Sequence, residues 1–62
     1  REETHAETDA SYVLVVPKMI VLKSGDLVTV QEGPAKAVYN VTACHVLDPY
    51  KNEYEIVFRG DV

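Results

Sequence analysis

Two segments, 35–47 and 53–59, alternate between apolar and polar side chains, and this pattern constrains the fold more than any other feature of the sequence. Successive side chains of a strand point to opposite faces, so a period of two is typical of a half-buried β-strand. Between the segments lies Asp48–Asn52, whose proline suits a turn, and the two strands are therefore predicted to pair as an antiparallel hairpin. The side chains predicted to face inward are Ala35, Ala37, Tyr39, Val41, Ala43, His45, Leu47, Tyr54, Ile56 and Phe58.

Two further strands are predicted nearer the N-terminus. Tyr12–Val16 is a short, wholly apolar run, which is typical of a strand buried on both faces. Pro17 cannot donate to a ladder, so this strand should end there or lie at a sheet edge. Leu27–Gln31 reads as a strand between two turns, one at 23–26 and one at 32–34.

The fold class follows from these elements and from the length of 62 residues, which allows one small core. Valine is abundant and no segment collects an apolar stripe at helical spacing. We therefore predict an all-β fold: a small four- to five-stranded SH3-like barrel or a strongly bent antiparallel sheet formed by residues 11–62. Residues 1–10 lack large apolar side chains and are predicted to form a flexible, disordered or frayed acidic tail.

The segments 23–30, 39–46 and 54–61 together resemble the SH3-like small barrels of the Tudor/KOW type. Such barrels often show a Gly-Asp pair before the first strand and alternating strands that begin with tyrosine. The resemblance implies a non-catalytic module that reads peptides. It also implies that the barrel is closed by the segment 12–22 or by another chain.

The resemblance raises the question of an aromatic cage around a methylated cation. The alternation instead assigns most of the aromatic rings to the core, because they fall on the inward faces. Tyr50 lies in the predicted hairpin loop and is the ring most available to a partner. The aromatic residues considered for a cage are Tyr39, Tyr50, Tyr54 and Phe58.

The sequence offers no recognisable catalytic, cofactor or metal site, and we expect no enzymatic activity. Cys44 and His45 are adjacent, so on a strand they point to opposite faces and cannot act as a nucleophile and its base. Cys44 is instead expected to be a small buried or half-buried hydrophobic residue. One cysteine cannot form a disulfide within the chain, which favours an intracellular, cytoplasmic protein and leaves a secreted or virion-associated form open.

Charge and hydropathy exclude two classes of partner. The net charge is −4 and the basic residues after Ser11 are scattered singly, so the basic stripe of a nucleic-acid-binding protein is missing. No apolar run approaches the ~20 residues that span a bilayer. Nucleic acid and membrane are therefore not expected as partners.

Two functions stay open from the sequence. One is a non-catalytic protein-interaction module that binds a peptide or protein. The other is a small structural or assembly subunit that forms homo-oligomers through an edge strand and its tail. An acidic inhibitor of a nucleic-acid-binding enzyme is a third, weaker interpretation. The residues predicted to contact a partner are Tyr50, Lys51, Asn52, Arg59 and Asp61.

Overall fold

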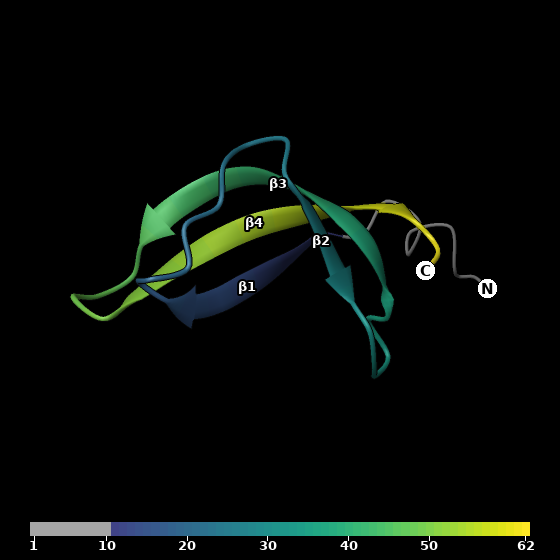
Figure 1. Ribbon diagram of the computed structural model, residues 1–62, viewed down its shortest axis with the longest axis horizontal. Helices are drawn as coiled ribbons and strands as arrows, with labels where there is room; N and C mark the ends of the chain where they lie inside the picture. The colour runs from purple at the N-terminus through teal and green to yellow at the C-terminus, as the bar shows by residue number, and fades with distance from the viewer. Residues whose placement is uncertain (1–10) are drawn as a thin grey trace.

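The computed structural model describes residues 11–62, which form a single four-stranded sheet without helices (Figure 1). The strands are β1 (Ser11–Pro17), β2 (Leu27–Val30), β3 (Ala37–Val46) and β4 (Lys51–Gly60). Their order is β1-β4-β3-β2 and every neighbouring pair is antiparallel, so β1 and β2 form the two edges. The predicted all-β fold class is confirmed. The predicted tail at 1–10 lies outside the described residues.

The predicted hairpin is present as β3 and β4, with a shorter turn than expected. Pairing continues to Val46 and Asn52, so the last two residues of the predicted loop belong to β4. Asp48 stabilises the turn, because its Oδ1 accepts hydrogen bonds from the backbone N–H groups of Tyr50 at 2.7 Å and Lys51 at 2.8 Å.

Two irregularities in the pairing of β3 with β4 curl the sheet. The register between β3 and β4 shifts between Val38 and Tyr39 and again between Val41 and Ala43. An extra residue in one strand bends that strand and increases its twist. At the second shift the extra residue is Thr42, whose hydroxyl donates to the Glu55 carbonyl oxygen at 3.2 Å. The result is the strongly curled half-barrel of Figure 1.

The concave side of this half-barrel holds the core. Tyr54 is 1% exposed, and the other buried side chains are similarly enclosed. The buried set is Ala37, Tyr39, Val41, Tyr54 and Ile56, and the partly buried side chains packed against it are Leu14, Val16, Leu22, Val28, Val30 and Phe58. The predicted inward faces of 37–41 and 54–58 are thereby confirmed, and the rings of Tyr39 and Tyr54 contribute to packing.

The connection between β1 and β2 is attached to the core by the Tyr54 hydroxyl. This hydroxyl accepts a hydrogen bond from the Leu22 N–H at 3.0 Å and donates one to the Ile20 carbonyl oxygen at 3.2 Å. The connection then ends in the predicted turn, where Gly25 has a φ of 94° and Asp26 Oδ2 accepts from the Lys23 N–H at 2.8 Å. One buried side chain thus fixes a segment more than thirty residues away in sequence.

The prediction that the first strand is buried on both faces is wrong. Val13 is 57% and Val15 47% exposed, while Leu14 and Val16 pack against the core. β1 is an edge strand, and no second layer covers the convex side of the sheet within residues 11–62. The alternative expectation, that Pro17 ends the strand and marks an edge, is confirmed.

The inward face predicted for 35–47 is wrong beyond Val41. The extra residue at the second register shift reverses the alternation, so Ala43 and His45 lie opposite Glu55 and Glu53 on the other face. Leu47 follows the strand and is 48% exposed. Cys44 is exposed rather than buried, because β3 continues past its last buried residue into the hairpin arm seen in Figure 1.

Candidate protein-interaction site

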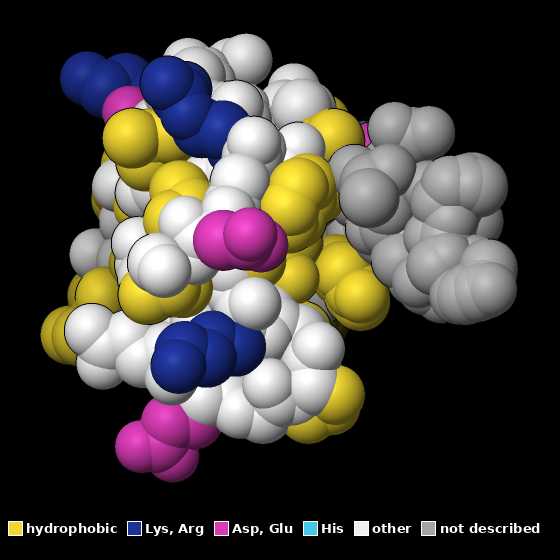
Figure 2. Space-filling model, turned by 90° about the vertical axis from the view of Figure 1, so that its right-hand side faces the viewer, with side chains coloured by type: hydrophobic (Ala, Val, Ile, Leu, Met, Phe, Trp, Pro, Cys, Tyr) yellow, Lys and Arg dark blue, Asp and Glu magenta, His cyan; other side chains and the backbone are white. Residues whose placement is uncertain are grey.

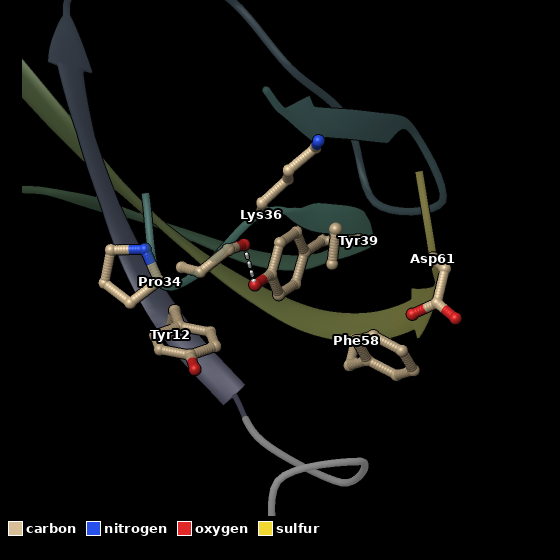
Figure 3. Close-up of a pocket in the computed structure, with 8 residues that line it drawn as sticks. Tyr12, Pro34, Lys36, Tyr39, Phe58 and Asp61 are labelled. Atoms are coloured by element: carbon tan, nitrogen blue, oxygen red, sulfur yellow. Dashed lines mark hydrogen bonds between the residues drawn. The ribbon is translucent and has the colours of Figure 1, made fainter. Parts of the chain in front are cut away.

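Three aromatic rings line the side wall of a hollow in the half-barrel (Figure 3). Tyr39 occupies the centre, and its ring makes edge-to-face contacts with Tyr12 at 5.5 Å and with Phe58 at 6.3 Å between centroids. Such T-shaped pairs are the favoured geometry for neighbouring rings. The rings come from β3, β1 and β4, so the curl of the sheet brings them together. We call this site the aromatic hollow.

The other wall of the aromatic hollow is the turn that precedes β3. The hollow measures about 470 Å³, and Lys36 and Asp61 place one charge of each sign beside the rings. The Tyr39 hydroxyl donates to the Ala35 carbonyl oxygen, which fixes the turn over the ring (Figure 3). At this end of the molecule, hydrophobic side chains surround an acidic one, with basic side chains above and below (Figure 2). The lining residues are Tyr12, Pro34, Ala35, Lys36, Ala37, Tyr39, Phe58 and Asp61.

The folded state should lose stability at alkaline pH because of Tyr39, the central ring of the aromatic hollow. Burial, and secondarily the neighbouring Tyr12, raises the pKa of Tyr39 above its ordinary value. A raised pKa for an acid means that the folded state favours the neutral hydroxyl. The stabilisation is therefore complete below the pKa that Tyr39 has in the unfolded chain, and it is lost as pH rises through the pKa that Tyr39 has in the folded protein. We expect the melting temperature of the unmodified chain to fall above about pH 10, the ordinary tyrosine pKa. The melting temperature of Tyr39→Phe should fall less steeply over the same range. Equal pH profiles for the two proteins would contradict this assignment.

Within residues 11–62, the backbone groups along the outer edge of β1 have no pairing partner. The Lys18 N–H donates to the Tyr50 carbonyl oxygen at 2.8 Å and continues the β1–β4 register by one residue. Hydrogen-bonded and non-bonded pairs alternate along an antiparallel ladder. The N–H and C=O groups of Val13 and Val15 therefore point away from β4. Pro17 shares this orientation, so its missing N–H removes no bond from the sheet.

Apart from Pro17 at its end, this edge carries none of the features that usually protect an edge strand. Charged side chains and bulges commonly prevent an edge from pairing with another chain. The strand Ser11–Pro17 contains no charged residue, and its register with β4 runs without a shift. Only Pro17, at its end, limits pairing. The exposed side chains of Val13 and Val15 add an apolar strip on the convex side.

A second, shallower hollow lies at the other end of β1. It measures about 430 Å³ and is bordered by the end of β1 and by the hairpin turn. Tyr50 is 78% exposed beside it. Because Tyr12 borders the first hollow and Val15–Pro17 borders the second, β1 runs from one hollow to the other.

The residues predicted to contact a partner fall at two separate ends of β4. Tyr50, Lys51 and Asn52 lie at the hairpin end, where the first two border the second hollow. Arg59 and Asp61 lie at the opposite end, where Asp61 borders the aromatic hollow. The ten-residue strand between them extends roughly 30 Å. One small ligand cannot contact both groups, whereas an extended chain beside β1 can approach both.

Sequence reasoning missed the part played by β1. Tyr12, Val13 and Val15 were predicted to be buried, yet all three are exposed on the edge strand, and Tyr12 and Val15 border the two hollows. One signal was available, because Pro17 ends the strand. No charged side chain in this short strand reveals which face is exposed.

Comparison with protein-family models, curated proteins and solved structures finds no match. Within residues 11–62, no three side chains of metal-binding type gather into a cluster. The same part of the chain has no helix of the length and hydropathy needed to cross a membrane.

Proposed function

We propose that this chain is a non-catalytic protein-interaction module that binds an extended segment of a protein partner along the outer edge of β1. The observation that carries the proposal is the row of backbone groups at Val13 and Val15, which are unpaired in the described part of the chain and lie on a strand without charged residues. Strand addition to a sheet edge obtains its affinity from main-chain hydrogen bonds and its specificity from alternate side chains.

The two faces of β1 would contact different side chains of the added strand. Side chains on the convex face would pack against Val13 and Val15. Side chains on the concave face would lie near the aromatic hollow, where rings beside the Asp61 carboxylate suit an apolar or a basic group. The exposed Tyr50 and its neighbours Lys51 and Asn52 extend this surface at the hairpin end.

The resemblance to SH3-like barrels of the Tudor/KOW type supports the same class of function, and the curled four-stranded sheet is compatible with it. The aromatic set differs from the one considered for a cage. Tyr54 is enclosed in the core and Tyr50 lies beside the second hollow, whereas Tyr12 joins Tyr39 and Phe58. An intracellular location and the absence of catalysis are part of this proposal.

Hydrogen exchange with a strand-forming peptide tests the proposal. The probe is a synthetic peptide of alternating threonine and valine with lysines at both ends, which has strong strand propensity and no sequence in common with β1. At saturating peptide and low micromolar concentration of the chain, we expect the amides of Val13 and Val15 to exchange at least ~10-fold more slowly, because they gain a bonded partner. Unchanged exchange at these two amides would refute binding at this edge.

Three variants supply the controls. Val15→Pro removes an outward N–H at an edge position and should abolish the protection. Val15→Thr keeps both the N–H and the branched shape, and should retain it. Thr29→Pro makes the corresponding change at the outer edge of β2. Asp26 points its carbonyl oxygen toward β3, where it accepts from the Val41 N–H, and the backbone groups alternate in direction along the strand, so the Thr29 N–H points away from β3. This third variant should bind the peptide as the unmodified chain does.

A further inference from the structure

We infer that the segment taken up by β1 is β1 of a second copy of this chain, paired antiparallel about a two-fold axis at Leu14. The inference rests on the proposed function, because it names the partner of the same edge. It predicts a symmetric dimer in which two half-barrels share one eight-stranded sheet, with the two β1 strands at its centre.

The outward backbone groups fix which registers are allowed. Only residues with outward N–H and C=O groups can form the hydrogen-bonded pairs of the new ladder, so Val13 and Val15 must occupy those pairs. Centring the axis on Leu14, the middle residue of β1, pairs Val13 of each copy with Val15 of the other. The two pairs give four main-chain hydrogen bonds and keep the whole of Ser11–Pro17 within the ladder.

Pairing of β1 with its own copy brings no like charges together. A two-fold axis brings each side chain close to its own copy or to a near neighbour in the strand, and like charges placed opposite each other destabilise a sheet. β1 contains no charged residue, so this penalty is absent. The strand is therefore complementary to itself in a way that a charged edge is not.

The side chains on both faces become apolar pairs. On the convex face, the exposed Val13 and Val15 of the two copies form one continuous strip across the axis. On the concave face, Tyr12, which is 42% exposed, lies opposite Val16 of the other copy. Pairs of aromatic and β-branched residues across two strands stabilise a sheet.

The second sheet edge is a weaker candidate for this contact. β2 contains four residues, and only Leu27 and Thr29 point their backbone groups outward. β1 contains seven residues, of which Ser11, Val13 and Val15 point both backbone groups outward, and it borders both hollows. More backbone groups and more exposed apolar surface therefore favour pairing through β1.

Disulfide trapping tests the partner and the register together. In a Cys44→Ser background, which removes the exposed native thiol, one chain carries Val13→Cys and the other carries Val15→Cys, with one of them ¹⁵N-labelled so that their masses differ. Opposed residues of a bonded pair have Cα atoms ~5.5 Å apart, within the range of a disulfide. Under a glutathione redox buffer, we expect the mixed dimer to exceed each like-with-like dimer at least ~10-fold. With equal amounts of the two chains, a mixed dimer only about twice as abundant as each like-with-like dimer is the statistical ratio of random collision and would overturn the inference, and so would an excess of the Val13→Cys homodimer.

Solution mass supplies the second measurement. The unmodified chain should sediment as a dimer at high micromolar concentration, Val15→Pro as a monomer, and Thr29→Pro as a dimer. A monomer at every concentration up to ~1 mM, close to the weakest range of specific association, would overturn the inference. If the threonine–valine peptide still protects Val13 and Val15 in that case, the proposed function survives and only the identity of the partner fails.

Discussion

Tyr54→Ala should leave most of the protein unfolded at room temperature. Replacing a buried aromatic ring by alanine costs about 3–5 kcal/mol, and the Tyr54 ring is 1% exposed. A chain of 62 residues has a total stability of roughly 3–9 kcal/mol. The loss of one ring is therefore comparable to the whole free energy of unfolding. Circular dichroism with urea titration at low micromolar concentration measures the effect.

Two companion variants separate the contributions of the ring and the hydroxyl. Tyr54→Phe keeps the ring but leaves the Leu22 N–H and the Ile20 carbonyl oxygen without their partner, at a cost of about 1–3 kcal/mol. Tyr50→Ala deletes the same atoms from a side chain that is 78% exposed, and should change stability by less than about 0.5 kcal/mol. If Tyr54→Ala unfolds no more readily than Tyr50→Ala, the half-barrel core described above is wrong.

The hairpin could be predicted from sequence because two local signals agree there. The alternation in 53–59 is interrupted only by Val57, and Asp48 and Pro49 carry ordinary turn chemistry. Both signals depend on neighbouring residues alone. The structure accordingly confirms the pairing of β3 with β4 and the inward positions of Tyr54 and Ile56.

The faces beyond Val41 could not be predicted, because a β-bulge leaves little trace in a single sequence. Thr42 is an unremarkable strand residue, and nothing in its type shows that it lacks a partner in β4. One extra residue nevertheless moves every later side chain to the other face. His45 consequently lies beside Glu55, with 2.6 Å between its Nε2 and the Glu55 Oε2, instead of in the core.

The candidate site could be predicted only in part, for a reason of topology. Tyr50 and Asp61 were placed on exposed segments because their neighbours are turn residues. The role of β1 depends on the strand order, in which β4 lies between β1 and β3. A run of apolar residues is equally compatible with a central strand and with an edge strand that pairs with another chain. Only the arrangement of the whole sheet distinguishes them.

Ile56→Ala and Val57→Ala should differ strongly in their effect on stability, although the residues are adjacent. Ile56 is 3% exposed on the concave face and packs within the core, so its truncation should cost about 2–5 kcal/mol. Val57 lies on the convex face opposite Asn40, and its truncation should cost about 1 kcal/mol, mainly through lost strand propensity. Chemical denaturation of both variants under the same conditions measures the difference.

The stabilities of Ile56→Ala and Val57→Ala, measured at several protein concentrations, also bear on the proposed dimer. Unfolding of a dimer shifts with concentration, whereas unfolding of a monomer does not. We expect the difference between Ile56→Ala and Val57→Ala to persist at low micromolar concentration, because it arises inside one half-barrel. Equal costs for the two substitutions in the monomer would mean that both faces of β4 are covered to the same extent. The single-layered half-barrel would then have to be abandoned.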